Sequence, residues 1–169
     1  MKLVLATIKD LNKIKEMYTK IIKNMYKNNI KIWNDFYPNE VFKSDIENKY
    51  LYILKKDNKI VGCFSLYEHK DIEKDIMWKD KKAKAFLLNR VGVNINYLNQ
   101  GIGQEIINRA CKIAKEKEAK YLRLLVSDIN TPAINLYIKC NLSKVKGVHE
   151  EIINDKVSIY EYGFEKELV

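Results

Sequence analysis

The stretch that decides the fold is Tyr97-Leu98-Asn99-Gln100-Gly101-Ile102-Gly103-Gln104. It lies between an apolar run at 86–93 and an amphipathic run at 102–114. A strand that leads through a glycine-rich turn into a helix directs backbone N–H groups and the positive end of the helix dipole at one place. The stretch therefore predicts a site for an anion, and we expect the ligand to carry phosphate.

Three kinds of phosphate loop compete for this stretch. A P-loop requires Lys and then Ser or Thr after its second Gly, whereas Gln104-Glu105 follow Gly103. A dinucleotide fingerprint requires a third Gly where this chain has Ile106, and it occurs early in a βαβ unit. A pyrophosphate cradle for coenzyme A fits the Gly-x-Gly spacing and its mid-chain position. A purely structural turn before a helix is also common and stays open at this point.

A second informative segment is Asn130-Thr131-Pro132-Ala133-Ile134-Asn135-Leu136-Tyr137-Ile138-Lys139-Cys140-Asn141-Leu142, which follows a strand-like run at 121–126. Thr131 is suited to cap a helix and Pro132 to occupy its first position. Helical spacing then places Tyr137 on one face, together with Ala133 and Cys140. The segment predicts Tyr137 on a short helix just beyond a strand end.

Together, the two segments resemble the GCN5-related N-acetyltransferase (GNAT) superfamily. Its acetyl-CoA signature reads Arg/Gln-x-x-Gly-x-Gly/Ala at a helix start; Gly101 and Gly103 match it, while Leu98 stands where Arg or Gln is usual. Its later pattern, Asn-x-x-Ala-x-x-Leu-Tyr-x-Lys-x-Gly-Phe, is matched in place by Asn130, Ala133, Leu136, Tyr137 and Lys139, with Asn141-Leu142 in place of Gly-Phe. The segments 32–38, 45–46, 76–78 and 89–93 are further similar to a bacterial GNAT subgroup.

The resemblance implies a set of coenzyme A contacts. The cradle would hold the pyrophosphate, and it consists of Leu98, Asn99, Gln100, Gly101, Ile102, Gly103 and Gln104. The strand end Val91-Gly92-Val93 would pair with the pantetheine amides, and the N–H of Val93 would lie near the thioester oxygen. Asn130 and Lys139 would also contact the cofactor. The Tyr137 hydroxyl would protonate the leaving thiolate. Periodicity alone favours a core position for Tyr137 on its helix, and the matching context from Asn130 to Lys139 reverses that preference.

The acceptor amine is expected to bind among aromatic side chains. Trp33, Asp35, Tyr37 and Trp78 are the candidates, because aromatic rings around a carboxylate suit a cationic amine. The same residues also suit an alternative in which they pack a loop onto the core.

No residue is singled out as the general base. Glu68 and His69 end a predicted strand near the expected amine entrance, and either is also compatible with a plain surface position. Asn89 lies on the strand expected to bind coenzyme A, where it could orient water but not act as a base. Glu68 and Asn89 are therefore candidates for the substrate site.

The composition favours a globular chain with anionic partners. The chain has 169 residues and a formal net charge of +9, which suits one domain over 1–169 and a ligand with several phosphates. Nucleic acid is the rival partner. Lysine supplies most of the positive charge, however, and Arg90, Arg109 and Arg123 are the only arginines, whereas base reading favours arginine forks. We therefore expect no nucleic-acid partner.

The remaining features predict a cytoplasmic protein without a metal. Cys63, Cys111 and Cys140 form no C-x-x-C pair and are expected to be reduced, and no metal-ligand cluster is apparent. Charged residues follow the first apolar run at once, so we expect no signal peptide, and no apolar run is long enough to span a membrane. Both a monomer and a homodimer are compatible with the sequence.

The order of elements predicts an α/β fold, with a central mixed, mostly antiparallel sheet and helices on both faces. The expected strands are 3–8, 50–54, 60–68, 85–93, 121–126, 144–148 and 156–164, and the expected helices are 11–25, 41–49, 102–116 and a short one around Tyr137. Hairpin turns are expected at 57–59 and 154–155, with a bulge at Gly62. This order agrees with the GNAT fold.

The sequence is compatible with three functions. The first is an N-acetyltransferase acting on a primary amine of a small molecule or a peptide. The second is a module of the same fold that binds acyl-CoA without transferring it, which the Leu98 departure favours. The third, a basic nucleic-acid-binding protein, predicts a steep salt dependence and gives Gly101 and Gly103 no role.

Overall fold

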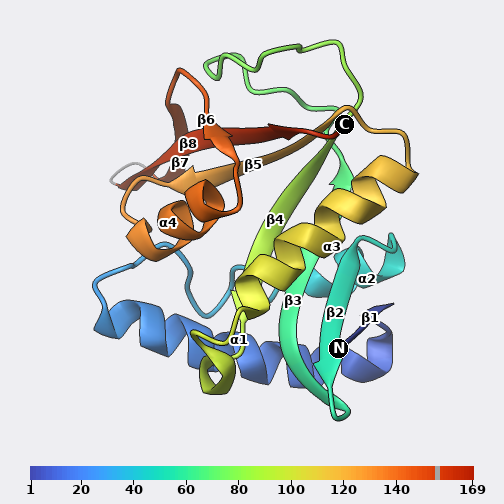
Figure 1. Cartoon of the computed structure of the whole chain (residues 1–169). Helices are drawn as coiled ribbons and strands as arrows, with labels where there is room; N and C mark the ends of the chain where they lie inside the picture. Colours follow the sequence, from blue (N-terminus) through green and yellow to red (C-terminus); the bar gives the residue numbers. More distant parts are fainter. Residues whose placement is uncertain (155–156) are drawn as a thin grey trace. The chain divides into compact units, whose positions relative to one another are not determined.

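The structure is a computed structural model that describes residues 1–154 and 157–169. It is a mixed α/β protein with a mostly antiparallel sheet flanked by helices, as predicted (Figure 1). The strands are β1 (Lys2–Leu5), β2 (Leu51–Lys56), β3 (Lys59–Glu68), β4 (Ala85–Val93), β5 (Tyr121–Ser127), β6 (Ser143–Lys144), β7 (His149–Asn154) and β8 (Val157–Glu167). The helices are α1 (Leu11–Lys27), α2 (Phe42–Glu47), α3 (Ile102–Glu116) and α4 (Thr131–Lys139).

The chain divides into two compact units, and each is described by itself. The first contains residues 1–66 and 89–109, and the second contains residues 67–88 and 110–169. The expectation of one functional domain over 1–169 stays a prediction. Within the described residues, no helix combines the length and the apolar character needed to cross a membrane.

In the first unit, β1 pairs antiparallel with β2, and β2 pairs antiparallel with β3. Asp57 and Asn58 join β2 to β3 with φ angles of 49° and 60°, the left-handed conformation that tight hairpin turns require. The register shifts between Leu54 and Lys55, where Leu54 pairs with Gly62 and Lys55 with Ile60. The predicted hairpin and the bulge near Gly62 are therefore confirmed.

Helices cover both faces of the first unit's strands. Successive side chains of β3 point to opposite faces, so neighbouring positions contact different helices. Cys63 is fully buried and belongs to a core cluster with Ile14, Met17 and Tyr18 of α1. The next position, Gly62, faces the other way, and a Cβ there would lie 2.8 Å from a side-chain carbon of Ile106 in α3.

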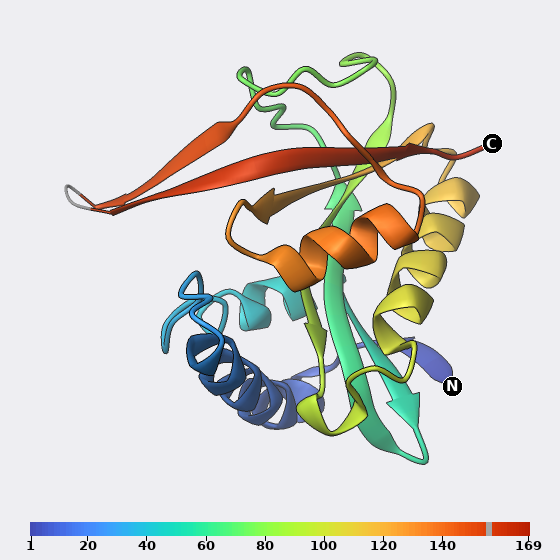
Figure 2. The ribbon, with the colours of Figure 1, turned by 60° about the vertical axis from the view of Figure 1, so that its left-hand side comes forward.

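In the second unit, β5 pairs parallel with residues 85–87 of β4 and antiparallel with β8, and β8 also pairs with β6 and β7. Helix α4 covers one face of β8 (Figure 2). On this face, the ring centroids of Tyr137 and Phe164 lie 6.2 Å apart. The segment 70–84 covers the other face, where a Cβ at Gly163 would lie 2.7 Å from Ile76 and 3.0 Å from Trp78. Glycine is therefore required for this close packing.

The prediction of a strand at 144–148 is wrong. β6 ends at Lys144 and β7 begins at His149. Gly147 lies between them with φ 104°, and a Cβ there would lie only 2.0 Å from the Asp75 carbonyl oxygen. This close contact with a distant segment breaks the strand in two. Of the hairpin turn expected at 154–155, residue 155 lies outside the described residues, as does the expected start of the last strand at 156.

Candidate active site

The glycine-rich turn of the first unit has the conformation that an anion cradle needs. Asn99 and Gly101 both adopt left-handed backbone angles, with φ 59° and 78°, and α3 begins at Ile102. The N–H of Glu105 closes the first helical turn on the Gly101 carbonyl at 3.0 Å. The N–H groups that precede it lie at the open end of the helix, which helix geometry leaves for an external partner.

Space and charge at this turn favour a large anion. Leu98, Asn99, Gln100 and Gly101 are exposed, and a Cβ at Gly101 would meet no atom within 4 Å. Ile102 is buried, whereas Gly103 and Gln104 are half-buried. The Glu105 carboxylate, which would oppose an anion, is paired with Arg109 at 2.8 Å. The cradle therefore offers backbone dipoles, with Leu98 contributing no charge.

The end of β4 lies in the same unit. Gly92 is buried, and a Cβ there would lie 2.6 Å from the Tyr18 ring, so that glycine alone fits without displacing the ring. Val91 and Val93 are half-buried on either side of it.

Tyr137, Asn130 and Lys139 belong to the second unit. Tyr137 is only 6% exposed, and burial raises its pKa, so the hydroxyl stays protonated and able to donate at neutral pH. Asn130 is the helix cap, because its side chain accepts a hydrogen bond from the N–H of Ala133 at 3.4 Å; the prediction that Thr131 caps the helix is wrong. Thr131 is instead the first helical residue, and Lys139 is exposed in the last turn.

Comparison with known families shows to which family the chain belongs, whereas the role of the Gly-x-Gly turn stays a prediction. The model of the acetyltransferase (GNAT) family matches residues 14–141, which is most of the chain. The chain belongs to the GNAT family. No curated protein matches this GNAT chain at a significant level.

Solved bacterial structures share the fold of this GNAT protein. A candidate acetyltransferase from Staphylococcus aureus Mu50 is 24% identical, with 100% of both chains covered and a TM-score of 0.73. A GNAT-family acetyltransferase from Streptococcus agalactiae is 14% identical over 98% of this chain and 94% of its own, with a TM-score of 0.82. The yncA protein of Salmonella typhimurium, solved with its cofactor acetyl-CoA, is 12% identical over 99% and 94%, with a TM-score of 0.68.

The first unit of the GNAT chain also holds three of the aromatic-site candidates. Trp33 is half-buried, with its ring 5.6 Å from that of Tyr18. The hydroxyl of Tyr37 accepts a hydrogen bond from Arg90 Nη1 at 3.3 Å. Asp35 is exposed, and its backbone carbonyl accepts from the Asn39 side chain at 3.3 Å. Tyr37 is thus oriented by a cation, and Asp35 is open to solvent.

Arg90 is the centre of a polar network that sequence reasoning missed. Its guanidinium donates two hydrogen bonds of 2.9 Å to the Asp45 carboxylate, and both side chains are 9% exposed. Asn89, proposed to orient water, uses its side-chain oxygen to accept the Arg90 N–H at 2.8 Å. A signal was present: an arginine within an apolar strand requires a buried acid, because arginine is rarely buried without a partner.

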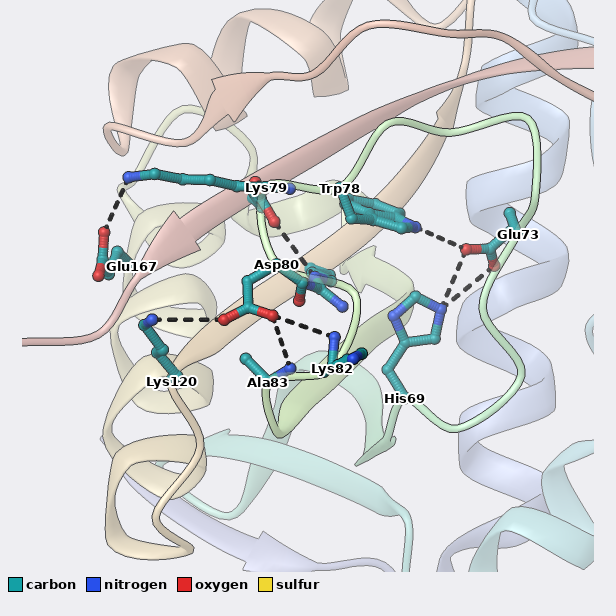
Figure 3. A network of polar contacts seen from close by, with 11 residues as sticks. His69, Glu73, Trp78, Lys79, Asp80, Lys82, Ala83, Lys120 and Glu167 are labelled. Carbon is teal, nitrogen blue, oxygen red and sulfur yellow. Dashed lines mark hydrogen bonds and ion pairs between the residues drawn. The ribbon is translucent and has the colours of Figure 1, made fainter.

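In the second unit, Trp78 and His69 share one carboxylate (Figure 3). The Trp78 indole N–H donates to Glu73 at 3.1 Å, and His69 Nε2 lies 3.0 Å from the same carboxylate. Trp78 is 4% exposed, so it lines the protein interior of this unit. Glu68 is exposed and lies 3.8 Å from Lys70.

The run of lysines at 79–84 is tied into the same network, as Figure 3 also shows. Lys79 pairs with Glu167 at 3.1 Å, and Asp80 pairs with Lys120 at 3.5 Å. Local acids therefore offset part of this positive run, which weakens the nucleic-acid alternative.

A further carboxylate, Glu161, has a strongly shifted pKa. Burial, together with the neighbouring carboxylates of Glu151 and Glu73, raises the pKa of Glu161 to about 7, although His149 opposes the shift. The raised value means that the folded state holds a proton which the unfolded chain, with a glutamate pKa of 4.5, releases. Stability from this group is complete below about pH 4.5 and is lost as the pH rises to about 7.

We expect Glu161→Gln to remove this loss. The variant should exceed the wild type in unfolding free energy by about 1–3 kcal/mol at pH 8 and match it near pH 4.5. Urea unfolding at the two pH values measures the difference. Glu150→Gln, an exposed position on the neighbouring strand β7, is the control. Equal stability of Glu161→Gln and the wild type at pH 8 would contradict the shift.

Proposed function

We propose that this GNAT protein transfers an acetyl group from acetyl-CoA directly to a primary amine of a small molecule or a peptide. Membership of the GNAT family supports an acyltransferase activity. The observation that carries the proposal of a direct transfer from acetyl-CoA is the exposed turn at 98–101, with its left-handed Gly101, followed by the unobstructed start of α3. Acetyl-CoA, the co-substrate, fits this turn because its pyrophosphate needs backbone donors and room.

In this proposal, acetyl-CoA supplies the acetyl group as an activated thioester, and the chain supplies three things. The cradle from Leu98 to Gln104 holds the pyrophosphate. The N–H of Val93, at the end of β4, stabilises negative charge on the thioester oxygen; removal of one such donor typically costs about 3 kcal/mol of transition-state stabilisation. The neutral hydroxyl of Tyr137 gives its proton to the departing sulfur, while the amine releases its own proton to water.

The non-catalytic alternative rests on Leu98. An acyl-CoA-binding module requires the cradle but not the Tyr137 hydroxyl. Such a module also needs less exact positioning of the cofactor than an enzyme does, which agrees with the absence of Arg or Gln at position 98. Release of free thiol from acetyl-CoA in the presence of a panel of primary amines separates the two functions, because binding alone releases no thiol.

The test of the cradle is isothermal titration calorimetry of acetyl-CoA with the wild type and with Gly101→Asp. We expect micromolar binding by the wild type. A carboxylate facing the pyrophosphate, and a side chain forced to φ 78°, should weaken binding by at least about 100-fold, which corresponds to about 3 kcal/mol.

Asn108→Asp is the matched control, because it adds the same charge at an exposed position further along the same helix. It should bind acetyl-CoA as the wild type does. Absence of binding by the wild type would overturn the proposed function and make nucleic-acid binding, tested by its salt dependence, the next hypothesis. Equal affinity of Gly101→Asp and the wild type would show that the pyrophosphate binds elsewhere.

A further inference from the structure

Arg90 has a backbone conformation that a plain strand would not contain. It lies within β4 and has φ 50°, the left-handed region that a non-glycine residue enters only at a cost of about 1–3 kcal/mol. Such a conformation persists only where the surrounding structure holds it. All of the contacts described below lie within the first unit.

The Arg90 carbonyl is held by a buried hydroxyl. The Tyr18 hydroxyl donates to this oxygen and lies 3.4 Å from the carbonyl of Cys63. Tyr18 is 0% exposed, and its ring lies 4.6 Å from that of Phe42. Burial raises the pKa of Tyr18 well above its usual value, so it remains a donor at all physiological pH values. The same ring contacts the position of Gly92, two residues further along β4.

The Arg90 side chain is held by a second anchor. The fork of two hydrogen bonds to Asp45 fixes the plane of the guanidinium, which a single contact or a lysine would not do. Asp45 belongs to α2, and the Tyr37 hydroxyl accepts a further bond from the same guanidinium at 3.3 Å. The backbone on the other side is held as well, because the Ser65 hydroxyl donates to the Asn89 carbonyl at 3.3 Å.

Stability alone does not account for this arrangement. A buried ion pair loses hydration that its attraction barely offsets, and well-packed apolar side chains at the same positions are often at least as stabilising. What the arrangement provides is a fixed backbone geometry at Arg90, immediately before Val91-Gly92-Val93. We call Tyr18, Asp45 and Arg90 the β4 clamp.

We propose that the β4 clamp makes Arg90 a positioning residue, which aims the N–H groups of residues 91–93 at the thioester carbonyl of acetyl-CoA. The inference rests on the proposed function, since it concerns the same co-substrate. It assigns Tyr18, Asp45 and Arg90 an indirect role in acetyl transfer, because none of them needs to contact the reacting atoms. The clamp should therefore affect alignment of the carbonyl more than affinity for the cofactor.

The experiment is infrared difference spectroscopy of acetyl-CoA labelled with ¹³C at the thioester carbonyl, bound to the wild type, Tyr18→Phe and Arg90→Lys. Tyr18→Phe removes one hydroxyl and keeps the ring; Arg90→Lys keeps the charge and removes the fork. Tyr52→Phe is the matched control, because it removes the same hydroxyl from a half-buried tyrosine of the first unit. The Tyr52 ring stacks on Phe64, which is outside the clamp. Calorimetry gives the Kd of each variant, and thermal unfolding shows that each is folded.

Hydrogen bonding to the aimed N–H groups should lower the carbonyl stretching frequency in the wild type and in Tyr52→Phe. In the two clamp variants, the frequency should return at least halfway to that of free acetyl-CoA, while the Kd changes by less than about threefold, because the cradle lies outside the clamp. With an amine that supports turnover, kcat should fall about tenfold or more at a nearly unchanged KM.

A wild-type carbonyl frequency in both folded variants would overturn the inference. If only one variant folds, its spectrum decides; if neither folds, the clamp is structural and the inference is also overturned. Absence of acetyl-CoA binding by the wild type would overturn the proposed function itself. Binding without a change in the carbonyl band of the clamp variants would overturn only the role of the clamp.

Discussion

Tyr137→Phe is expected to lower kcat by about 10²–10⁴-fold, the usual contribution of a positioned general acid. The hydroxyl is the group that the proposed mechanism uses, whereas the ring packs 6.2 Å from Phe164 and is retained in the variant. The fold and the Kd for acetyl-CoA should therefore change little. The measurement is steady-state release of free thiol with an amine that the wild type accepts, together with calorimetry.

Tyr160→Phe is the control for this prediction, because Tyr160 is a 47% exposed tyrosine of β8 in the same unit. It should keep wild-type activity. Since burial raises the pKa of Tyr137 above the ordinary value of 10.0, ionisation of this hydroxyl should not lower the rate of the wild type at any pH below 10. Unchanged kcat in Tyr137→Phe would assign the proton transfer to another group or to water, and would return Tyr137 to the helix core.

Arg123→Met should produce the largest loss of stability, about 3–5 kcal/mol of unfolding free energy, because it leaves the buried Glu165 carboxylate without its charged partner and with the backbone N–H of Lys79, at 2.9 Å, as a neutral donor. Arg123 is 0% exposed, and its Nε donates to Glu165 at 3.2 Å. Its Nη2 donates to the Asp80 carbonyl at 2.6 Å, and Trp78 and Tyr121 stack against the guanidinium at 5.1 and 5.2 Å. Urea unfolding at neutral pH measures the loss.

Arg109→Met is the matched control, because it makes the same substitution in an ion pair that is open to solvent. The Arg109 side chain in this pair is 37% exposed. Its effect should stay below about 0.5 kcal/mol. The double variant Arg123→Met with Glu165→Gln should recover part of the loss, since the uncompensated charge is then absent. A loss below about 1 kcal/mol in Arg123→Met would show that water reaches Glu165 in the folded protein.

Local chemistry determined the elements that could be predicted well. The bounds expected for β4 and α3, 85–93 and 102–116, agree with the structure residue for residue. A continuous apolar run specifies a buried strand, and the paired glycines before an amphipathic run specify a turn followed by a helix. Aspartate and asparagine tolerate left-handed backbone angles in turns, so the hairpin at Asp57 and Asn58 was predictable from neighbouring residues alone.

The clamp and the strand break at Gly147 were not predictable in this way. Arg90 and Asp45 are 45 residues apart, Arg123 and Glu165 are 42 apart, and periodicity does not record which distant acid a buried arginine will meet. Gly147 ends the pairing of its strand because Asp75, also distant in the chain, lies against it. Asn130 rather than Thr131 caps α4, a choice between adjacent residues that the final course of the chain decides.

The sequence by itself therefore determined the family signature, the glycine-rich turn before α3 and most of the secondary structure, because those features depend on residues within a few positions of one another. The tertiary structure alone decided the backbone angle at Arg90, the contacts that hold it and the shifted pKa of Glu161. Each of these depends on burial and on partners from other elements, and both arise only when distant segments pack together.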